Sequence, residues 1–137
     1  MPDVVSCILQ QGNKILLLHR SQKVGTYKGL WGGITGFVEA DETPLQTAYK
    51  EIFEETGIKD DQIKLKCVLE PICFRDIYRG KEYNWVVHPF IFVLLASQNI
   101  TCDWEHVQYQ WIDPREIDKF NTVPRLKEII KAVFYEK

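Results

Sequence analysis

The chain has no excess of charge of either sign. Its 17 lysine and arginine residues nearly balance its 19 aspartate and glutamate residues, and the formal net charge at pH 7 is -2. A protein that binds nucleic acid through its overall field needs a basic surface, so we expect no stable nucleic-acid partner. Any anionic ligand must then be held by a local group of cations.

The cysteines are few and widely spaced, at Cys7, Cys67, Cys73 and Cys102. No CxxC pair occurs, which argues against a zinc knuckle and against a small disulfide scaffold. We expect reduced, mostly buried thiols, although spacing alone leaves open a folded site of four thiolates.

The sequence also lacks a long apolar run. The longest, WVVHPFIFVLLA, contains His88 and Pro89 and is too short to span a bilayer. The N-terminus shows no basic region followed by an apolar run and a small-residue cleavage site, so it does not resemble a secretory signal. The expectation is a cytoplasmic protein without a membrane partner.

With 137 residues, 45% of them hydrophobic, the chain can bury a core and fits a single domain over residues 1–137. Alternating and β-rich patterns predict strands, and the glycine-containing segment 21–33 predicts an exposed loop. The predicted strands are residues 4–10, 14–20, 34–39, 62–70, 72–78, 84–96 and 106–112, the first two forming a hairpin and the turn at 79–84 joining two others. A last helix is predicted from Pro124 to Phe134, with Thr122 as its cap. Few helices and a mixed sheet indicate an α+β fold or a three-layer α/β/α sandwich.

One further helix has clear start and stop signals. Thr43 can cap it with Gln46 three residues on, Pro44 suits the first helical position, and Gly57 can adopt the left-handed conformation that ends a helix. Its apolar residues recur at three- and four-residue steps and form a stripe for the core. These residues are Leu45, Ala48, Tyr49 and Ile52.

The last turns of this helix gather negative charge at Glu51, Glu54 and Glu55. At about 100° per residue the three carboxylates share one side of the helix, away from Ile52. The helix dipole disfavours anions at this end, so a cation should compensate them. Hard divalent cations such as Mg²⁺ take carboxylate, water and phosphate oxygens as ligands.

The wider pattern from Gly36, GFVEADETPLQTAYKEIFEETGI, resembles the Nudix box. This box is the signature of hydrolases that cleave a nucleoside diphosphate linked to another moiety. The resemblance implies a Nudix-type α/β/α sandwich with a mixed β-sheet, and one to three Mg²⁺ or Mn²⁺ ions that bridge a nucleotide-like substrate. It implies metal ligation by Glu51, Glu54 and Glu55, and structural support from Gly36, Glu42 and Gly57.

This sequence departs from the family pattern at two places. The family has arginine where this chain has Lys50, and lysine keeps the charge but loses the planar fork that grips a carboxylate. Glu42 is expected to pair with Lys50 rather than to bind the metal. The usual PGG before the box is replaced by residues 34–36, ITG, where the backbone carbonyl near Thr35 can still serve the metal.

Flanking segments also resemble the family. WGGITGFVE and EHVQYQWID are most similar to the dihydroneopterin triphosphate pyrophosphatase branch, which implies that Glu105 supplies a further carboxylate. A proton must be taken from the attacking water, and Glu54 is the first candidate, with the other carboxylates of the cluster and Glu105 left open. Without the resemblance, Glu105 is a loop charge. The catalytic set is therefore Glu54, Glu51, Lys50 and Glu105.

Residues for the rest of the substrate are less constrained. Arg20 at the end of a strand is the best phosphate contact, followed by Lys23 and Lys28 in the loop, and each can equally be a solvated surface charge. Aromatic residues can stack on a base or pterin, although aromatics are more often core. These are Tyr27, Trp31, Phe74, Tyr78, Tyr83 and Trp85. We interpret His88 as a structural histidine. We interpret Pro71 as the end of a strand, although a proline at this place after the box faintly resembles the pattern of the ADP-ribose-cleaving members.

Two alternatives stay open beside a Mg²⁺-dependent pyrophosphohydrolase. A Nudix domain with a weakened metal site would only bind nucleotides, and Lys50 is the feature that favours this. A Nudix-fold isopentenyl diphosphate isomerase would rely on a catalytic cysteine and lack an intact box. By family analogy the chain can form a homodimer.

Overall fold

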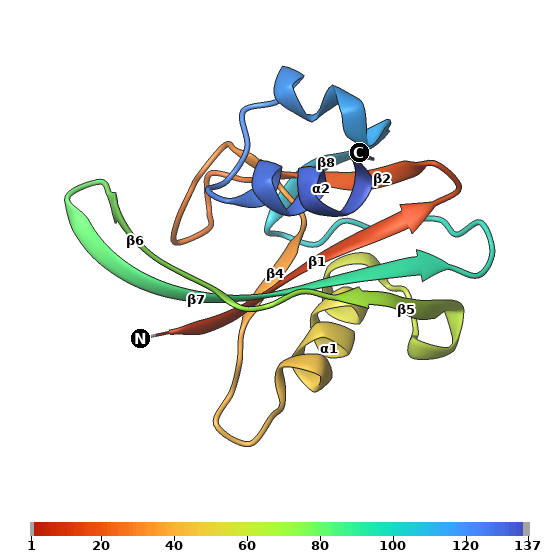
Figure 1. The fold of residues 1–137 in the computed structure, drawn as a ribbon, viewed down its shortest axis with the longest axis horizontal. Helices are drawn as coiled ribbons and strands as arrows, with labels where there is room; N and C mark the ends of the chain where they lie inside the picture. Colours follow the sequence, from red (N-terminus) through yellow and green to blue (C-terminus); the bar gives the residue numbers. More distant parts are fainter. Residues whose placement is uncertain (1, 136–137) are drawn as a thin grey trace.

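A mixed sheet forms the centre of the fold in the computed structural model, which describes residues 2–135. Its strands, in chain order, are β1 (Asp3–Gln11), β2 (Lys14–Arg20), β3 (Trp31–Gly32), β4 (Ile34–Phe37), β5 (Ile63–Val68), β6 (Ile72–Tyr78), β7 (Lys81–Leu94) and β8 (His106–Ile112). The helices are α1 (Pro44–Thr56) and α2 (Leu126–Phe134), with short 3-10 helices η1 (Asp60–Gln62) and η2 (Pro114–Lys119). The predicted hairpin, strands and α+β class are confirmed (Figure 1).

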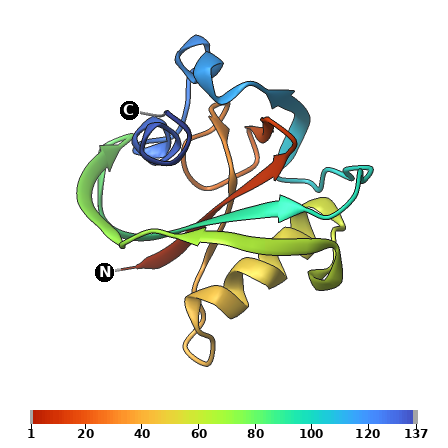
Figure 2. The same cartoon turned by 45° about the vertical axis from the view of Figure 1, so that its right-hand side comes forward.

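Strands β1 and β7 are the axis of the sheet. They run parallel from the pair Asp3 and Val86 to the pair Gln10 and Val93, while β7 pairs antiparallel with β6 along its first half and with β5 along its second. The other side of β1 pairs antiparallel with β4 and, at its end, with β2. Figure 2 shows β6 and β7 curving toward α2. The curvature leaves a concave face between this hairpin and α2.

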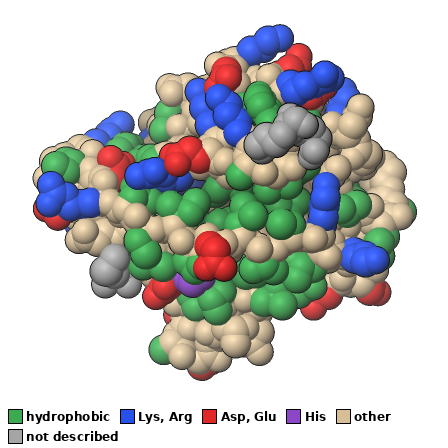
Figure 3. Space-filling view, viewed as in Figure 1, with side chains coloured by type: hydrophobic (Ala, Val, Ile, Leu, Met, Phe, Trp, Pro, Cys, Tyr) green, Lys and Arg blue, Asp and Glu red, His purple; other side chains and the backbone are tan. Residues whose placement is uncertain are grey.

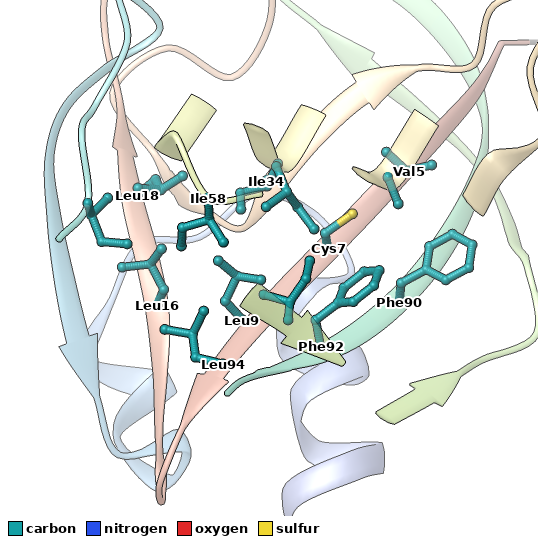
Figure 4. Close-up of a cluster of buried hydrophobic side chains, with 14 residues drawn as sticks. Val5, Cys7, Leu9, Leu16, Leu18, Ile34, Ile58, Phe90, Phe92 and Leu94 are labelled. Carbon is teal, nitrogen blue, oxygen red and sulfur yellow. The ribbon is translucent and has the colours of Figure 1, made fainter. Parts of the chain in front are cut away.

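The two helices cover opposite sides of β1 and β7, which gives the expected three layers (Figures 1 and 2). Residues alternate across a strand, so Val5, Cys7 and Leu9 pack on the α1 side while Ile8 packs on the α2 side. Figure 4 shows the first cluster, in which Phe92 and Leu94 of β7 meet residues of β1. Burying a side chain of this size contributes about 1.5–3 kcal/mol, so this core fixes α1 on the sheet.

Local signals set the ends of α1 as predicted. The Thr43 side chain accepts a hydrogen bond from the Gln46 backbone N–H, and the Gln46 side chain accepts one from the Thr43 N–H. Gly57 ends the helix at φ 80°, with its N–H donating to the Phe53 carbonyl. An N-cap of this kind contributes about 1 kcal/mol. The helix that carries the carboxylates therefore begins and ends at defined residues.

Three local predictions were wrong. Helix α2 begins at Leu126, after Arg125 at φ 72°, and Thr122 pairs with Trp31 in an isolated bridge instead of capping the helix. The segment 21–33 is not simply exposed, because Val24 and Tyr27 are buried, Tyr27 in a cluster with residues of β7, and Trp31 begins β3. Of the four free cysteines only Cys7 is buried and Cys73 is exposed, and no cluster of thiolates occurs among the described residues.

The surface in the view of Figure 3 carries many hydrophobic side chains in its middle, with lysine and arginine around them. Strands β5 and β6 expose Val68 and Ile77 by 58% and 62%. No described helix is both long and apolar enough to cross a membrane.

Candidate active site

Helix α1 places its three glutamates in three different environments. Glu54 is exposed, Glu51 is partly buried, and Glu55 is only 1% exposed. Glu51 and Glu54 line a cavity of about 680 Å³ together with Glu105, which comes from the segment just before β8. The carboxylates therefore form one wall of a cavity instead of a uniformly solvated helix face.

Gly36 lets Glu51 reach this wall. A Cβ atom built on Gly36 would clash with the carboxyl group of Glu51. Strand β4, which carries Gly36, is held by β1 through the pairs Val5 with Gly36 and Ser6 with Thr35. The missing side chain at position 36 is thus what allows α1 to lie close against β4 with Glu51 between them.

The predicted ion pair between Lys50 and Glu42 is present. Lys50 Nζ lies 2.7 Å from Glu42 Oε2, while Glu42 Oε1 accepts a hydrogen bond from Thr47 Oγ1 at 2.7 Å. Lys50 first and Thr47 second hold the pKa of the Glu42 carboxyl below its usual value. Both carboxylate oxygens of Glu42 are therefore bonded to side chains of α1, and Glu42 does not line the cavity.

A second cluster lies behind the wall, where Glu55, Glu105 and His106 each direct one ligand atom so that all three atoms lie within 4.8 Å of one another. Both carboxylate oxygens of Glu55 and the Nε2 atom of His106 are buried. None of these three atoms has a hydrogen-bond partner in the described part of the chain. A buried carboxylate without a partner is costly. These donors fit a divalent cation, which would satisfy them together.

The electrostatics of the cluster agree with this. Burial raises the pKa of the Glu55 carboxyl well above its usual range, and Glu51 and Glu105 raise it further. Burial likewise raises the pKa of Glu51 and of Glu105; Asp103 and Glu51 add to the shift of Glu105, whereas Glu55 partly opposes the shift of Glu51. Without a cation these groups repel one another, so a bound cation would restore their charged forms.

Arg20 is the buried cation of the cavity, which Lys81 also lines. It ends β2, is 9% exposed, and its Nε and Nη2 atoms donate to the Thr26 carbonyl at 3.2 and 2.8 Å. Its Nη1 donates to Thr35 Oγ1 at 3.4 Å, and no ion pair within 4.0 Å involves it among residues 2–135. Burial lowers the pKa of Arg20, and Glu105 acts in the opposite sense. A buried guanidinium without a carboxylate partner suits an incoming phosphate.

The hairpin of β6 and β7 forms another side of the cavity with its aromatic residues. Phe74, Tyr83 and Trp85 from β6 and β7 lie there, and the Trp85 ring stacks on Tyr83 with centroids 5.0 Å apart. Tyr27 fixes this side, because its hydroxyl donates to Asp76 Oδ2 at 2.6 Å and accepts from Trp85 Nε1 at 3.1 Å. One cavity is thus lined by a carboxylate wall, an aromatic wall and Arg20.

Some candidates lie elsewhere. Lys28 Nζ donates to the Gln22 carbonyl and Lys28 does not line the cavity, nor does Lys23. Trp31 is also outside it, because its ring stacks on His19 at 4.6 Å and packs against Phe120. Lys28 and Trp31, two predicted substrate contacts, therefore do not line this cavity. His88 pairs with Asp3 at 2.9 Å, in keeping with a structural histidine.

The sequence interpretation overlooked His106. Its side chain is fully buried, and its Nδ1 atom lies 3.1 Å from Asp103 Oδ1. The sequence feature that could have indicated it is DWEH, which places Asp103, Glu105 and His106 within four residues as potential metal ligands or their supports. Only Glu105 of this segment was predicted to belong to the site.

Comparison with known proteins agrees with this geometry. A family model described as NUDIX domain matches residues 1–133. The RNA pyrophosphohydrolase of Pelagibacter ubique is 25% identical over 142 residues, covering 92% of this chain and 88% of that protein. The uncharacterized Nudix hydrolase YvcI of Bacillus subtilis is 27% identical over 124 residues, covering 88% and 72%.

Solved structures share the fold. The E. coli dihydroneopterin triphosphate pyrophosphohydrolase superposes with a TM-score of 0.81 at 20% identity, covering 96% of this chain and 93% of that one. A C. elegans Ap4A hydrolase binary complex superposes with a TM-score of 0.78 at 19% identity, covering 96% and 93%. The family model matches nearly the whole sequence, and the carboxylate cluster and the three-layer fold agree with that match. The chain therefore belongs to the Nudix family of hydrolases.

Proposed function

We propose that this hydrolase cleaves a pyrophosphate bond in a nucleoside triphosphate or another nucleoside diphosphate linked to a second moiety, and that it requires a divalent cation. The observation that carries the proposal is one cavity of about 680 Å³ that is lined by carboxylates, aromatic rings and Arg20. A nucleotide combines the features that such a lining can bind, because its phosphates are charged and its base is a flat ring. Relatives named RNA pyrophosphohydrolase and NAD-capped RNA hydrolase support the type of bond.

The residues that would hold the cation are Glu51, Glu54, Glu55 and Glu105, with the carbonyl of Thr35 beside them. When bound, Mg²⁺ or Mn²⁺ neutralises phosphate charge and makes water a better nucleophile. Lys50 and Glu42 brace the helix that presents these carboxylates. Their work is positioning, since a misplaced carboxylate loses much of its effect.

Other side chains take the proton and orient the substrate. A carboxylate oxygen of Glu54, exposed at the cavity, takes the proton of the attacking water, because Glu55 is buried away from solvent. The Arg20 guanidinium binds a phosphate oxygen, which fixes the direction of the substrate. Phe74, Tyr83 and Trp85 exclude water from the flat end and stack on it.

The alternatives are less well supported. None of the four cysteines lines the cavity, so a cysteine-dependent isomerase has no nucleophile there. A pure binding module was suggested by Lys50, but Lys50 makes the brace to Glu42 at 2.7 Å.

The test is a substrate screen. The protein is incubated with Mg²⁺ or Mn²⁺ and a panel of nucleoside triphosphates, dinucleoside polyphosphates and nucleotide sugars, and phosphate release is followed after coupling to a phosphatase. We expect turnover that EDTA abolishes and added metal restores. Binding of every panel member without turnover of any would refute the hydrolytic proposal. Isotopically labelled water then identifies the phosphorus that is attacked.

A further inference from the structure

His106 is the buried group that the mechanism above does not use. It begins β8, its side chain is 0% exposed, and its Nε2 atom lies 3.7 Å from Glu55 Oε1. That distance is too long for a hydrogen bond, and neither atom has another partner in the part of the chain that the structure describes. Two buried polar atoms therefore face each other without a hydrogen bond.

The other ring nitrogen is firmly held. His106 Nδ1 lies 3.1 Å from Asp103 Oδ1, a carboxylate that can only accept, so Nδ1 carries the proton. The same Asp103 oxygen accepts the Glu105 backbone N–H at 3.1 Å. Asp103 thus fixes both the ring orientation of His106 and the start of the segment that carries Glu105.

This support is the arrangement that metal-binding histidines use. A ligating histidine nearly always gives its second N–H to a carboxylate or carbonyl, which leaves the first nitrogen free for the ion. Here the free Nε2 atom points into the cluster of Glu55 and Glu105, with the ligand atoms within 4.8 Å of one another. Two further bonds fix the segment, from the Ser21 N–H to the Glu105 carbonyl at 2.7 Å and from Ser21 Oγ to the Trp104 carbonyl at 3.1 Å.

We infer that Glu55, Glu105 and His106 form a mixed oxygen and nitrogen site that prefers a first-row transition metal, with Mn²⁺ as the probe, over Mg²⁺. The chemistry of the donors sets the preference. Magnesium demands oxygen ligands and keeps its waters, whereas imidazole suits transition metals. The inference deepens the proposed function, because it rests on the same carboxylates and names the ion class they hold.

The test detects the nitrogen directly and needs no substrate. One equivalent of Mn²⁺ is added to the full chain, and pulsed electron paramagnetic resonance is used to look for ¹⁴N modulation from an imidazole. We expect the modulation in the wild-type protein and its change when the histidines are labelled with ¹⁵N. Absence of nitrogen coupling, or coupling that histidine labelling leaves unaltered, would overturn the inference.

Variants assign the nitrogen to one histidine. His106→Gln should remove the coupling and weaken Mn²⁺ binding by roughly 10–100-fold, with Mg²⁺ binding changed less than about 3-fold because Mg²⁺ makes little use of nitrogen. His88→Gln is the matched control, since His88 pairs with Asp3 and does not line the cavity. Loss of the coupling in His88→Gln, or equal weakening of both ions in His106→Gln, would contradict the assignment.

The result is separable from the proposed function. If His106→Gln does not fold, the ¹⁵N-labelled wild-type protein still decides the question. If the substrate screen finds no hydrolysis but the nitrogen coupling is present, the metal site stands and only the proposed reaction fails. If hydrolysis is found and the coupling is absent, the reaction stands and this inference fails.

Discussion

The Nζ atom of Lys50 lies 2.7 Å from Oε2 of Glu42, and this pair ties the loop before α1 to the second turn of the helix. Lys50 occupies the position at which the family has arginine. The single contact replaces the bidentate grip that an arginine would make, so the brace is present but has one hydrogen bond instead of two.

Removing this brace should weaken catalysis. We expect Lys50→Met to lower kcat/KM by roughly 10–100-fold, the usual cost of losing a residue that orients metal ligands, because Glu51 and Glu54 follow Lys50 on the same helix. Steady-state kinetics at saturating Mn²⁺ measure it. Lys64→Met is the control, since Lys64 is exposed on β5 and takes part in no ion pair within 4.0 Å in the described residues. Lys50→Arg should keep or raise the activity, and a loss as large as that of Lys50→Met would refute the bracing role.

Glu54 should affect the chemical step without affecting the fold. Glu54→Gln keeps the shape but cannot take a proton, and general bases typically contribute about 10²–10⁴-fold, so kcat should fall by that order. The melting temperature should hardly move, because Glu54 is exposed. The exposed Glu70 provides the matched control variant, Glu70→Gln. Near-normal kcat in Glu54→Gln would remove Glu54 from the role and leave Glu105 as the candidate.

Much of α1, the helix that carries the carboxylates, could be predicted because the sequence features that define it are local. The cap of α1, its apolar stripe and its ending at Gly57 depend on residues within one or two turns, and each prediction was confirmed. The resemblance implied only that Gly36 gives structural support, and the structure adds the physical reason, because a Cβ atom at position 36 would clash with the carboxyl group of Glu51.

The rest depends on contacts between distant segments. Tyr27 lies in a segment that resembles an exposed loop, yet its hydroxyl bonds to Asp76, 49 residues away. His106 is buried at the start of β8, where it pairs with Arg20 at the end of β2. Nothing within a few residues of either position predicts such burial, since it is produced by the curvature of β6 and β7 and by the pairing of β2 with β8.

Burial of Glu55 predicts an unusual pH dependence of stability. Its pKa is raised in the metal-free fold above the unfolded value, so the fold is favoured when the group is protonated. The stability it contributes is present below the unfolded pKa of about 4.3 and is lost as the pH rises through the raised folded pKa.

Glu55→Gln should therefore make the metal-free protein more stable at high pH. In EDTA at pH 8 we expect the free energy of unfolding to rise by about 1–3 kcal/mol, the cost of a buried unpaired polar group, and the gain to vanish near pH 4. Urea unfolding at a series of pH values measures it, with Glu70→Gln as the exposed control. A variant that is less stable at pH 8 would show that Glu55 has a partner without metal. The same variant should lose metal binding, which separates function from stability.

Tyr27 should set substrate affinity rather than the chemical step. Tyr27→Phe keeps the ring but removes the hydroxyl that joins Asp76 to Trp85, and leaving buried partners unpaired costs about 1–3 kcal/mol. We expect a higher KM for a nucleotide found active in the screen, because the aromatic wall loses its anchor. We expect kcat to change less than about 3-fold, since the hydroxyl bonds to Asp76 and Trp85 and to none of the glutamates of the site. Tyr109→Phe is the matched control, because Tyr109 is 41% exposed on β8 and does not line the cavity. A fall in kcat at unchanged KM would instead tie Tyr27 to the carboxylate wall through Arg20 and the Thr26 carbonyl.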